Sequence, residues 1–418
     1  MVSVTKNNTP ALRFDGFGSE WEAKPLKNLG SSYGGLTGKT KEDFGHGDAR
    51  YITYLNVFEH AVIRDASQLG NTEIDNRQNE VKTGDVLFTV SSEVPEEVGM
   101  SAVWLGQDQS IYLNSFCFGF RPTTKLDSKF LAYVLRSPDF REKMTLLAQG
   151  ISRFNISKTR AMELEISLPT LEEQCAIGKL FADLDALIEQ HRAKHTNLQQ
   201  TKTALLQRMF PQDGADAPEL RLDGFSGAWD EAQIKNVSDV LVGNPFQSSS
   251  FADEGVRLVR GANVKRGWLD FDPSLTVFWP SVRGVETFLL DENDILLQMD
   301  GALIGKSFAM VSKTNLPALL VQRVARVRAH HNVDPKLLYQ WFVKDFFGYI
   351  RSVKTETAVP HLSALDILSF RVKIPPTIEE QRAVGEVFSN LDALIAAEAS
   401  YITQLTQAKT ALLQRMFV

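Results

Sequence analysis

Apolar residues recur with alternating four- and three-residue spacing in two long stretches of the 418-residue chain. The first stretch extends from Leu171 to Met209 and the second from Ile378 to Met416, and neither contains a proline. Such spacing predicts a helix whose apolar stripe packs on another helix as a coiled-coil seam. At about 1.5 Å per residue each helix is about 58 Å long, a length that requires a partner. The predicted apolar seam positions are Ile177, Phe181, Leu184, Ile188, Leu198, Leu205, Val384, Phe388, Leu391, Ile395, Leu405 and Leu412.

The two stretches are copies of each other at an offset of 207 residues, and both contain EEQ, LDALI and KTALLQRMF. A further shared segment, Leu12–Gly30, returns as Leu220–Ser238. A repeat of half the chain indicates a duplicated protein and not a solenoid. The natural partner of each helix is the other copy, antiparallel if a local two-fold axis relates them. Pairing Ile177 with Met416 then predicts that His195 faces Glu398. We interpret His191 and His195 as seam residues, with a pH-sensitive interhelical pair as the alternative.

Short apolar runs between turn signals predict a mixed globular region before each helix. The predicted strands are Tyr51–Phe58, Val86–Val90, Ser115–Phe120, Val256–Val264, Asp294–Met299 and Val321–Ala329, and the predicted helices are Phe130–Ser137 and Leu337–Ile350. The fold class is therefore α+β, with two globular domains separated by a long antiparallel two-helix coiled coil and an internal pseudo-two-fold duplication. The predicted divisions are 1–168 (with 1–10 disordered), 169–212, 213–375 and 376–418.

The composition of the chain restricts the classes of protein to which it can belong. The chain is 43% hydrophobic and 23% charged, with a net charge of −6, which is ordinary for a folded protein and does not favour nucleic-acid binding by bulk electrostatics. The two cysteines, Cys117 and Cys175, predict neither a disulfide framework nor a metal cluster. The polar N-terminal residues and the absence of an 18-residue apolar run predict no signal peptide, no membrane contact and a cytoplasmic location.

Several words in the chain carry a resemblance to a known family. They are LPTLEEQ (Leu168–Gln174) and IPPTIEEQ (Ile374–Gln381), each continuing into LDALI and KTALLQRMF, with GNPFQSSSF (Gly243–Phe251) and ENDILLQMDGALIGK (Glu292–Lys306) in the second globular region. In this order and duplicated, they resemble the specificity subunit of a type I restriction–modification system. The first region departs from the family pattern, since GSSYGGLTGK and FTVSSEVPEEVG replace two of these words.

The resemblance implies a non-catalytic subunit that binds double-stranded DNA. Each target-recognition domain would read one half-site, and the helix pair would set an unread spacer of about 5–8 base pairs, placing the half-sites about one helical turn apart. It implies two modification subunits that use S-adenosylmethionine to methylate adenine, and restriction subunits that use ATP with magnesium. No cofactor is expected in this chain. The predicted docking residues are Glu172, Glu173, Gln174, Glu379, Glu380 and Gln381, with the two KTALLQRMF segments; the alternative is that they only cap and pack the helices.

Enzyme motifs do not fit the sequence. Phe14–Gly18 has the spelling of an S-adenosylmethionine loop, but no strand precedes it and the second copy loses its first Phe and last Gly, whereas such loops follow a strand. Gly243–Phe246 lacks the second proline of an amino-methyltransferase motif, and GALIGK is too short for a phosphate-binding loop. No Cys/His spacing of a metal site is present. We therefore predict no catalytic residue and no metal.

DNA contacts are predicted in loops that hold polar and basic residues between strands. Lys and Arg neutralise phosphates, whereas Asn, Gln and Arg make bidentate contacts with base edges. The candidates in the first domain are Ser31, Ser32, Tyr33, Lys39, Lys41, Ser91, Ser92, Arg153, Asn155 and Lys158. Those in the second are Asn244, Phe246, Gln247, Ser248, Ser249, Arg260, Asn263, Lys265, Gln298, Lys306, Arg323 and His361.

Two other classes of protein are compatible with parts of the pattern. A duplicated coiled-coil scaffold whose modules bind protein or glycan explains the acidic net charge and the repeated helices. A single-chain restriction enzyme explains the recognition words, but the missing catalytic motifs disfavour it.

Overall fold

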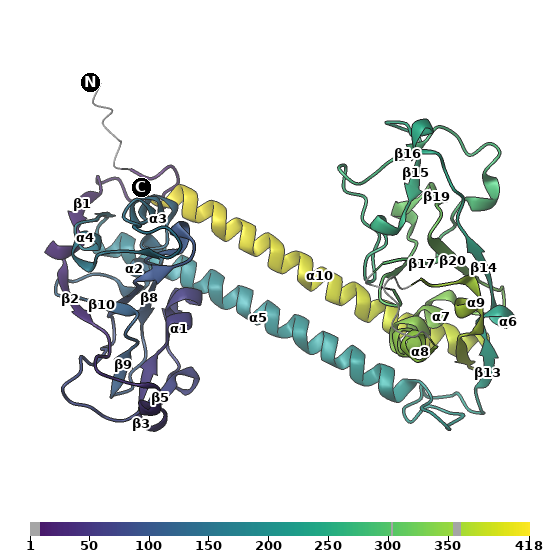
Figure 1. The fold of residues 1–418 in the computed structure, drawn as a ribbon, viewed down its shortest axis with the longest axis horizontal. Helices are drawn as coiled ribbons and strands as arrows, with labels where there is room; N and C mark the ends of the chain where they lie inside the picture. Colours follow the sequence, from purple (N-terminus) through teal and green to yellow (C-terminus); the bar gives the residue numbers. More distant parts are fainter. Residues whose placement is uncertain (1–8, 302–303, 354–360) are drawn as a thin grey trace. The chain divides into compact units, whose positions relative to one another are not determined.

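The computed structural model describes residues 9–301, 304–353 and 361–418 of the chain. They form two compact units (Figure 1): unit 1 contains the residues up to Arg192 together with Ser400–Val418, and unit 2 contains Ala193–Ala399. Both units mix helices and strands, as the hydrophobic pattern predicts. In the described part of the chain, no helix has the length and hydropathy needed to cross a membrane.

Two long helices dominate the helical content. Helix α5 extends over Leu171–Met209 and α10 over Ile378–Met416, the bounds that the apolar spacing predicts. The other α-helices are α1 (Tyr54–Glu59), α2 (Ser128–Val134), α3 (Pro138–Thr145), α4 (Lys158–Ala161), α6 (Ile234–Val237), α7 (Pro335–Trp341), α8 (Phe347–Val353) and α9 (Ala364–Ser369). The predicted helix Leu337–Ile350 is thus α7 and α8, joined by a π-helical segment at Phe342–Phe346.

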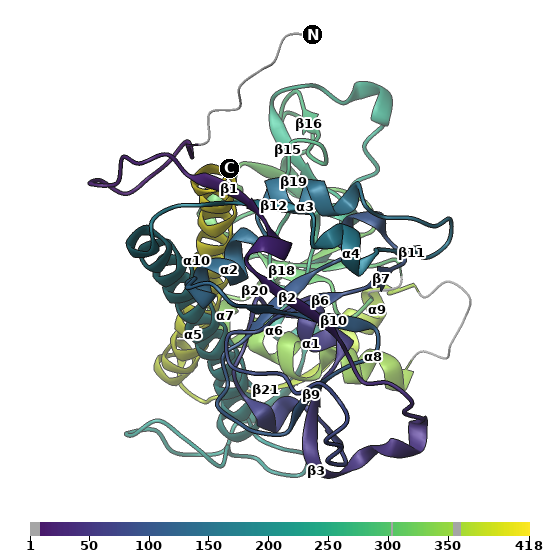
Figure 2. The same ribbon diagram turned by 90° about the vertical axis from the view of Figure 1, so that its left-hand side faces the viewer.

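The described residues of unit 1 form four sheets. The largest has the strand order β2-β10-β6-β8-β4, and Figure 2 shows its strands β2, β10 and β6. The second has the order β5-β3-β9, and the pairs β1-β12 and β11-β7 complete the set. The strands are β1 (Glu22–Pro25), β2 (Gly30–Gly34), β3 (Phe44–Ile52), β4 (Val62–Ile63), β5 (Gly70–Thr72), β6 (Val86–Thr89), β7 (Ser91–Ser92), β8 (Ser101–Trp104), β9 (Ile111–Leu113), β10 (Cys117–Pro122), β11 (Phe154–Asn155) and β12 (Glu165–Leu168).

Unit 2 repeats this topology. Its sheets have the orders β14-β20-β17-β18, β16-β15-β19 and β13-β21, so each corresponds to one sheet of unit 1. In both units the second sheet joins one parallel and one antiparallel pair. The strands are β13 (Asp230–Gln233), β14 (Ser238–Val242), β15 (Val256–Val259), β16 (Phe278–Trp279), β17 (Ile295–Gln298), β18 (Phe308–Met310), β19 (Ala318–Leu320), β20 (Val324–Ala329) and β21 (Arg371–Ile374).

The prediction of one strand over Tyr51–Phe58 is wrong. Strand β3 ends at Ile52 and helix α1 begins at Tyr54. Thr53 separates the two elements because its hydroxyl accepts a hydrogen bond from the Asn56 backbone N–H, and the Asn56 side chain accepts one from the Thr53 N–H. This reciprocal capping satisfies donors that the first turn of a helix leaves unpaired, so it outweighs the alternating apolar pattern.

The segments of α5 and α10 within each unit run antiparallel. In unit 1, Asp185 pairs with Lys409 and the His191 ring lies 4.6 Å from that of Tyr401. In unit 2, Lys194 Nζ lies 2.5 Å from Glu398 Oε1, and Lys202 Nζ lies 2.6 Å from Asp392 Oδ1. Buried Glu398 thus pairs with the residue before His195, one position from the predicted neighbour. All twelve apolar seam positions are buried or half-buried.

Each hydrophobic core contains the end of one long helix and the start of the other. The core of unit 1 includes Ile177 and Phe181 of α5 together with Met416 and Phe417. The core of unit 2 includes Met209 and Phe210 with Val384 and Phe388 of α10. The shared LDALI and KTALLQRMF words therefore build equivalent junctions between the helices and the globular parts.

Candidate nucleic-acid interface

An arginine–glutamate pair with a buried carboxylate attaches each copy of the repeated segment that contains Arg13 or Arg221 to a long helix. The Arg13 guanidinium donates to both carboxylate oxygens of Glu173, with Nε–Oε1 and Nη2–Oε2 distances of 2.6 Å. In unit 2, Arg221 binds Glu380 in the same way, at 2.8 and 2.7 Å. The bond to Glu173 raises the pKa of Arg13. Bidentate, charge-assisted pairs of this kind fix geometry as well as charge.

The glutamine that follows each glutamate is also internal. The Gln174 side chain donates to the Pro169 carbonyl and accepts from the Asp127 backbone N–H, and Gln381 binds Pro375 and Asp334 in the same manner. Glu173, Gln174, Glu380 and Gln381 are all buried, with exposed fractions of 0–4%. The prediction that these four residues lie on exposed docking stretches is therefore wrong, because their polar atoms bind within their own unit. Glu172 and Glu379 remain exposed.

A second repeated pair, between an aspartate and an arginine, stabilises the largest sheet of each unit. Buried Asp85, just before β6, accepts two hydrogen bonds from Arg121 at 2.9 and 2.6 Å, and buried Asp294, before β17, accepts two from Arg328 at 2.7 Å. These bonds raise the pKa of both arginines. Because the pairs occupy the same strand positions in the two units, the following strand ends are comparable position by position.

In unit 2 the strand ends bring several predicted DNA-contacting residues together. The Met299 N–H donates to the Arg323 carbonyl at 2.9 Å, and the Leu362 N–H donates to the Met299 carbonyl at 2.7 Å. Asn244 reaches the same place, since its carbonyl accepts from the Gln322 N–H at 2.9 Å. We define edge 2 as Asn244, Gln298, Asp300, Arg323 and His361.

Asp300 organises the side chains of edge 2. Its carboxylate lies 3.2 Å from Arg323 Nε and also binds His361 Nδ1, and Gln298 Nε2 donates to the Asp300 carbonyl at 2.7 Å. The Arg323 and His361 side chains remain 73% and 60% exposed. Arg323 was predicted inside a strand, but it occupies the turn before β20 with a φ of +68°, which turns its side chain away from the sheet. Edge 2 therefore presents hydrogen-bonding groups to solvent.

Unit 1 builds the equivalent edge with different side chains. The Val90 N–H donates to the Phe116 carbonyl at 3.0 Å, and the Ile156 N–H donates to the Val90 carbonyl at 3.0 Å. These bonds match the two that join Met299, Arg323 and Leu362, so Phe116 stands where unit 2 has Arg323. The backbones of Ser91 in β7 and Asn155 in β11 pair antiparallel. The backbones of Asp300 and His361 form the corresponding antiparallel bridge in unit 2. We define edge 1 as Ser91, Ser92, Phe116, Arg153 and Asn155.

Four residues of edge 1, Ser91, Ser92, Phe116 and Arg153, line a cavity of about 410 Å³. Phe116 is 57% exposed, and the Arg153 guanidinium lies over its ring at 5.8 Å. The Tyr54 hydroxyl donates to the Ser91 carbonyl at 2.7 Å, and the Ser92 hydroxyl donates to Glu97 at 3.0 Å. Both serines are buried, so Arg153, Asn155 and Phe116 supply the exposed surface of this edge.

The remaining predicted DNA contacts lie away from the edges, and some are internal. Phe246 packs in an apolar cluster with its ring 4.8 Å from that of Trp279, and Asn263 is fully buried. The Tyr33 hydroxyl donates to Asp85 at 2.6 Å, and burial raises its pKa. These three residues therefore support the fold, and we no longer count them as candidates for DNA contact.

Some of the other candidates interact with neighbouring residues of their own unit, and the rest are exposed. Lys39 pairs with Asp75 at 3.2 Å and Lys265 with Asp270 at 3.5 Å, Arg260 is half-buried and binds the Leu275 carbonyl, and Lys306 lies over the Phe347 ring at 4.0 Å. Ser32 is half-buried on β2. The exposed candidates are Ser31, Lys41, Lys158, Gln247, Ser248 and Ser249.

Sequence reasoning missed Phe116, Asp300 and Gln322. Phe116 lies directly before strand β10, and Gln322 lies two residues before strand β20. Both side chains are exposed. The signal for Phe116 was a large apolar residue one position before the buried strand β10, but an isolated apolar residue is indistinguishable from a core residue without the register of the sheet.

Comparison with known proteins agrees with this arrangement. Residues 18–200 and 227–407 match the family model described as "Type I restriction modification DNA specificity domain". The chain is 24% identical over 374 residues to the type I restriction enzyme MjaVIII specificity subunit of Methanocaldococcus jannaschii, covering 86% of this chain and 83% of that protein. It is 29% identical over 170 residues to the EcoAI specificity subunit of Escherichia coli, covering 40% of this chain and 28% of that subunit.

A solved structure shows the same fold. The type I restriction–modification S subunit from M. genitalium aligns with a TM-score of 0.66 at 17% identity, over 98% of this chain and 99% of that one. The duplicated fold and the two family matches define a protein with two DNA specificity domains. The chain belongs to the type I restriction–modification DNA specificity family, and it is a specificity subunit, a non-catalytic component of such a complex. This assignment decides against both the scaffold and the single-chain enzyme.

Proposed function

We propose that the two units read the two halves of a bipartite double-stranded DNA target, unit 1 with edge 1 and unit 2 with edge 2. The observation that carries this proposal is the positional equivalence of the edges. The same backbone hydrogen bonds hold Phe116 and Arg323, and the residues presented there differ. An unchanged frame with different exposed residues is what two readers of different sequences require.

The side chains of the edges have the chemistry for base readout. Arg323, Gln298 and Asn244 belong to the residue types that make bidentate contacts with guanine or adenine, and Phe116 offers an apolar face for a thymine methyl group. The exposed Lys41, Lys158, Ser31, Gln247, Ser248 and Ser249 contact phosphates in this proposal. A net charge of −6 means that partner subunits supply much of the remaining phosphate contact.

The paired helices act as a spacer in this function. Their predicted apolar seam positions are buried or half-buried, and the pairs Asp185–Lys409 and Lys202–Asp392 are related by the 207-residue repeat. We infer an antiparallel coiled coil, whose length of about 58 Å separates half-sites about one helical turn apart and leaves about 5–8 base pairs unread.

Equivalent partners dock on the repeated helix ends. Thr203, Ala204, Gln207 and Arg208 in α5 are identical to Thr410, Ala411, Gln414 and Arg415 in α10, and all eight are exposed. Packing does not require identity at exposed positions, whereas two copies of one partner do. We assign these faces, with Glu172 and Glu379, to two modification subunits that carry S-adenosylmethionine; restriction subunits using ATP and magnesium join the same complex.

The test is sequencing of methylated adenines in cells that carry the modification subunits with or without this chain. We expect methylation that depends on the chain, in a motif of two fixed half-sites separated by unread base pairs. A motif without a gap would remove the spacer role of the helices. Methylation that is identical with and without the chain would overturn the proposal as a whole.

A further inference from the structure

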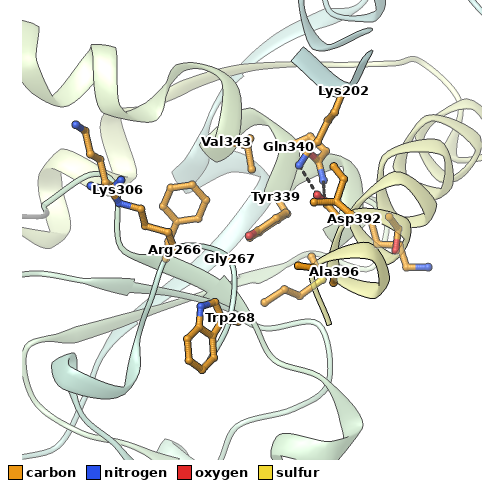
Figure 3. Close-up of a pocket in the computed structure, with 16 residues that line it drawn as sticks. Lys202, Arg266, Gly267, Trp268, Lys306, Tyr339, Gln340, Val343, Asp392 and Ala396 are labelled. Atoms are coloured by element: carbon orange, nitrogen blue, oxygen red, sulfur yellow. Dashed lines mark hydrogen bonds and ion pairs between the residues drawn. The ribbon is translucent and has the colours of Figure 1, made fainter. Parts of the chain in front are cut away.

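Unit 2 contains a large cavity that the DNA-reading role does not use. Its volume is about 720 Å³, and it lies between the globular part of unit 2 and helix α10 (Figure 3). Its apolar lining comes from Trp268, Phe308, Tyr339, Val343 and Ile395. Cavities of about 300–1,000 Å³ with such a lining accommodate small organic ligands.

Two cationic side chains that line this cavity, Arg266 and Lys306, have no carboxylate partner among the described residues. Figure 3 shows Arg266 and Lys306 on one side of it, with the Lys202–Asp392 pair on the other. Within the ranges that the structure describes, neither Arg266 nor Lys306 forms an ion pair with a carboxylate, and Lys306 is balanced only by the Phe347 ring at 4.0 Å. An anionic group is the complement to two neighbouring cations of this kind.

Two aromatic side chains of the cavity, Trp268 and Tyr339, also have surfaces or polar atoms that are available to a ligand. Trp268 is 55% exposed although it lines an apolar cavity, so its indole face is open to a stacking partner. Tyr339 is only 8% exposed, and burial raises its pKa. Among the described residues its hydroxyl has no hydrogen-bond partner, and Figure 3 shows it directed into the cavity. The hydroxyl is therefore available to form a hydrogen bond with a ligand bound in the cavity.

Unit 1 fills the equivalent space with its own side chains. Helices α2 and α7 occupy the same place in the repeat, with Asp127 and Asp334 as their N-caps, so Arg136 corresponds to Val343. The Arg136 guanidinium donates to the carbonyls of Ser101, Val57, Phe58 and His60, which holds the end of α1 in that space. The cavity is thus a distinct property of unit 2 and not a by-product of the repeated frame.

We propose that this cavity is a binding site for a nucleoside phosphate, with the base stacked on Trp268, the phosphates bound by Arg266 and Lys306, and the Tyr339 hydroxyl bonded to the base or the sugar. Stacking on tryptophan and phosphate binding by arginine supply the two halves of such recognition. The ligand is either a free nucleotide or one nucleotide of a strand, and it bridges the globular part of unit 2 to α10. This site is independent of the assignment of edge 1 and edge 2.

The experiment titrates ADP into the purified chain and follows both tryptophan fluorescence and heat. We expect saturable quenching with one site per chain. Arg266→Glu and Lys306→Glu each weaken binding by about tenfold or more, because each removes a charge-assisted contact. Trp268→Phe removes most of the quenching while heat still reports a site. Arg283→Glu, an equal change at an exposed arginine of the same unit, leaves the affinity unchanged, and adenosine binds about tenfold more weakly than ADP.

Competition with a short single-stranded oligonucleotide then separates the two sources. Displacement of ADP identifies a strand nucleotide, and undisturbed ADP identifies a free nucleotide, and both outcomes support the site. Thermal unfolding of each variant checks that it folds, and Arg266→Gln replaces any charge reversal that does not. Absence of saturable heat with ADP, or equal affinity in wild type and Arg266→Glu, overturns the proposal.

Discussion

Edge 1 and edge 2 occupy the same positions on the same frame, yet they present opposite chemistry. Edge 2 gathers Arg323 and His361 around a carboxylate, Asp300. Edge 1 replaces this cluster by Phe116 with Arg153 over its ring, above a cavity bounded by Tyr54. The backbone bonds that hold Phe116 and Arg323 differ in length by only 0.1 Å, at 3.0 and 2.9 Å.

This contrast separates what the duplication must keep from what it is free to change. In the repeated Arg–Glu and Asp–Arg pairs the carboxylates are buried and the arginines are half-buried, and loss of either partner leaves an uncompensated charge. Among the edge residues, Phe116, Arg153, Asn155, Arg323 and His361 are exposed, so their replacement costs the fold little. Under the proposed function, recognition is therefore able to diverge in one unit without altering the other.

The largest effect is expected from breaking the frame. Glu173→Ala and Glu380→Ala each leave an arginine unpaired, and we expect each to lower the free energy of unfolding by about 3–5 kcal/mol. Because the geometry is repeated, the two losses should be similar. Chemical denaturation followed by circular dichroism measures both.

The neighbouring exposed glutamates supply matched controls. Glu172→Ala and Glu379→Ala should change stability by less than about 0.5 kcal/mol. A loss at Glu173 or Glu380 no larger than in these controls would show that the buried pairs do not hold the frame.

A smaller effect, confined to recognition, is expected from the edges. Arg323→Ala should relax one half of the methylated motif and Phe116→Ala the other, each by about 1–3 kcal/mol of discrimination, with no change in the thermal unfolding midpoint. Sequencing of methylated adenines in cells with each variant measures the two halves separately.

Lys313→Ala, at an exposed lysine of unit 2, serves as the control for the edge variants and should leave the motif intact. Relaxation of both halves by Arg323→Ala, or of neither, would contradict the assignment of one edge to one half-site.

The smallest effect concerns the two thiols. Burial raises the pKa of Cys117 to about 12, so at pH 8 almost none of it is thiolate, the reactive form. Cys175 is exposed, and its pKa is raised to a lesser degree by desolvation and by Asp127. We expect an alkylating reagent to label only Cys175 in the native chain, faster as the pH rises, and both thiols after denaturation.

Cys175→Arg tests the equivalence of the two helices at this position, since α10 carries Arg382 there. The variant should fold as the wild type does and show no labelling in the native state. Native labelling that persists in Cys175→Arg would mean that Cys117 is accessible.

The elements governed by periodicity were predictable from the sequence. The bounds of α5 and α10 follow from the repeat and the prolines before it, and the burial of their seam positions follows from the spacing, because every second turn of a helix returns to the same face. Edge 2 was predictable in part, since Gln298, Arg323 and His361 are polar or basic residues, with Gln298 as the last residue of β17 and Arg323 directly before β20. Their convergence on Asp300 depends on the register of β17 and β20, which periodicity does not define.

The predictions that failed did so because side chains bind partners that the local sequence pattern does not show. The EEQ word contains three polar residues and suggests an exposed surface, but Arg13 and Arg221, about 160 positions earlier in the chain, draw its second glutamate inside. The split at Thr53 depends on a capping interaction with Asn56, which competes with an equally valid strand pattern. A polar side chain at a loop predicts exposure only when no distant partner binds it.

The division of unit 1 into two chain segments has a consequence for its biosynthesis. Its core needs Met416 and Phe417, and the Leu12 N–H bonds to the Arg415 carbonyl at 2.8 Å, whereas unit 2 is one continuous segment. At about 5–20 residues per second, the ribosome takes on the order of 10–40 s to pass from the end of the first segment to the end of the second. The first unit to emerge is therefore the last to be completed, and its apolar face on α5 must stay unaggregated while unit 2 folds.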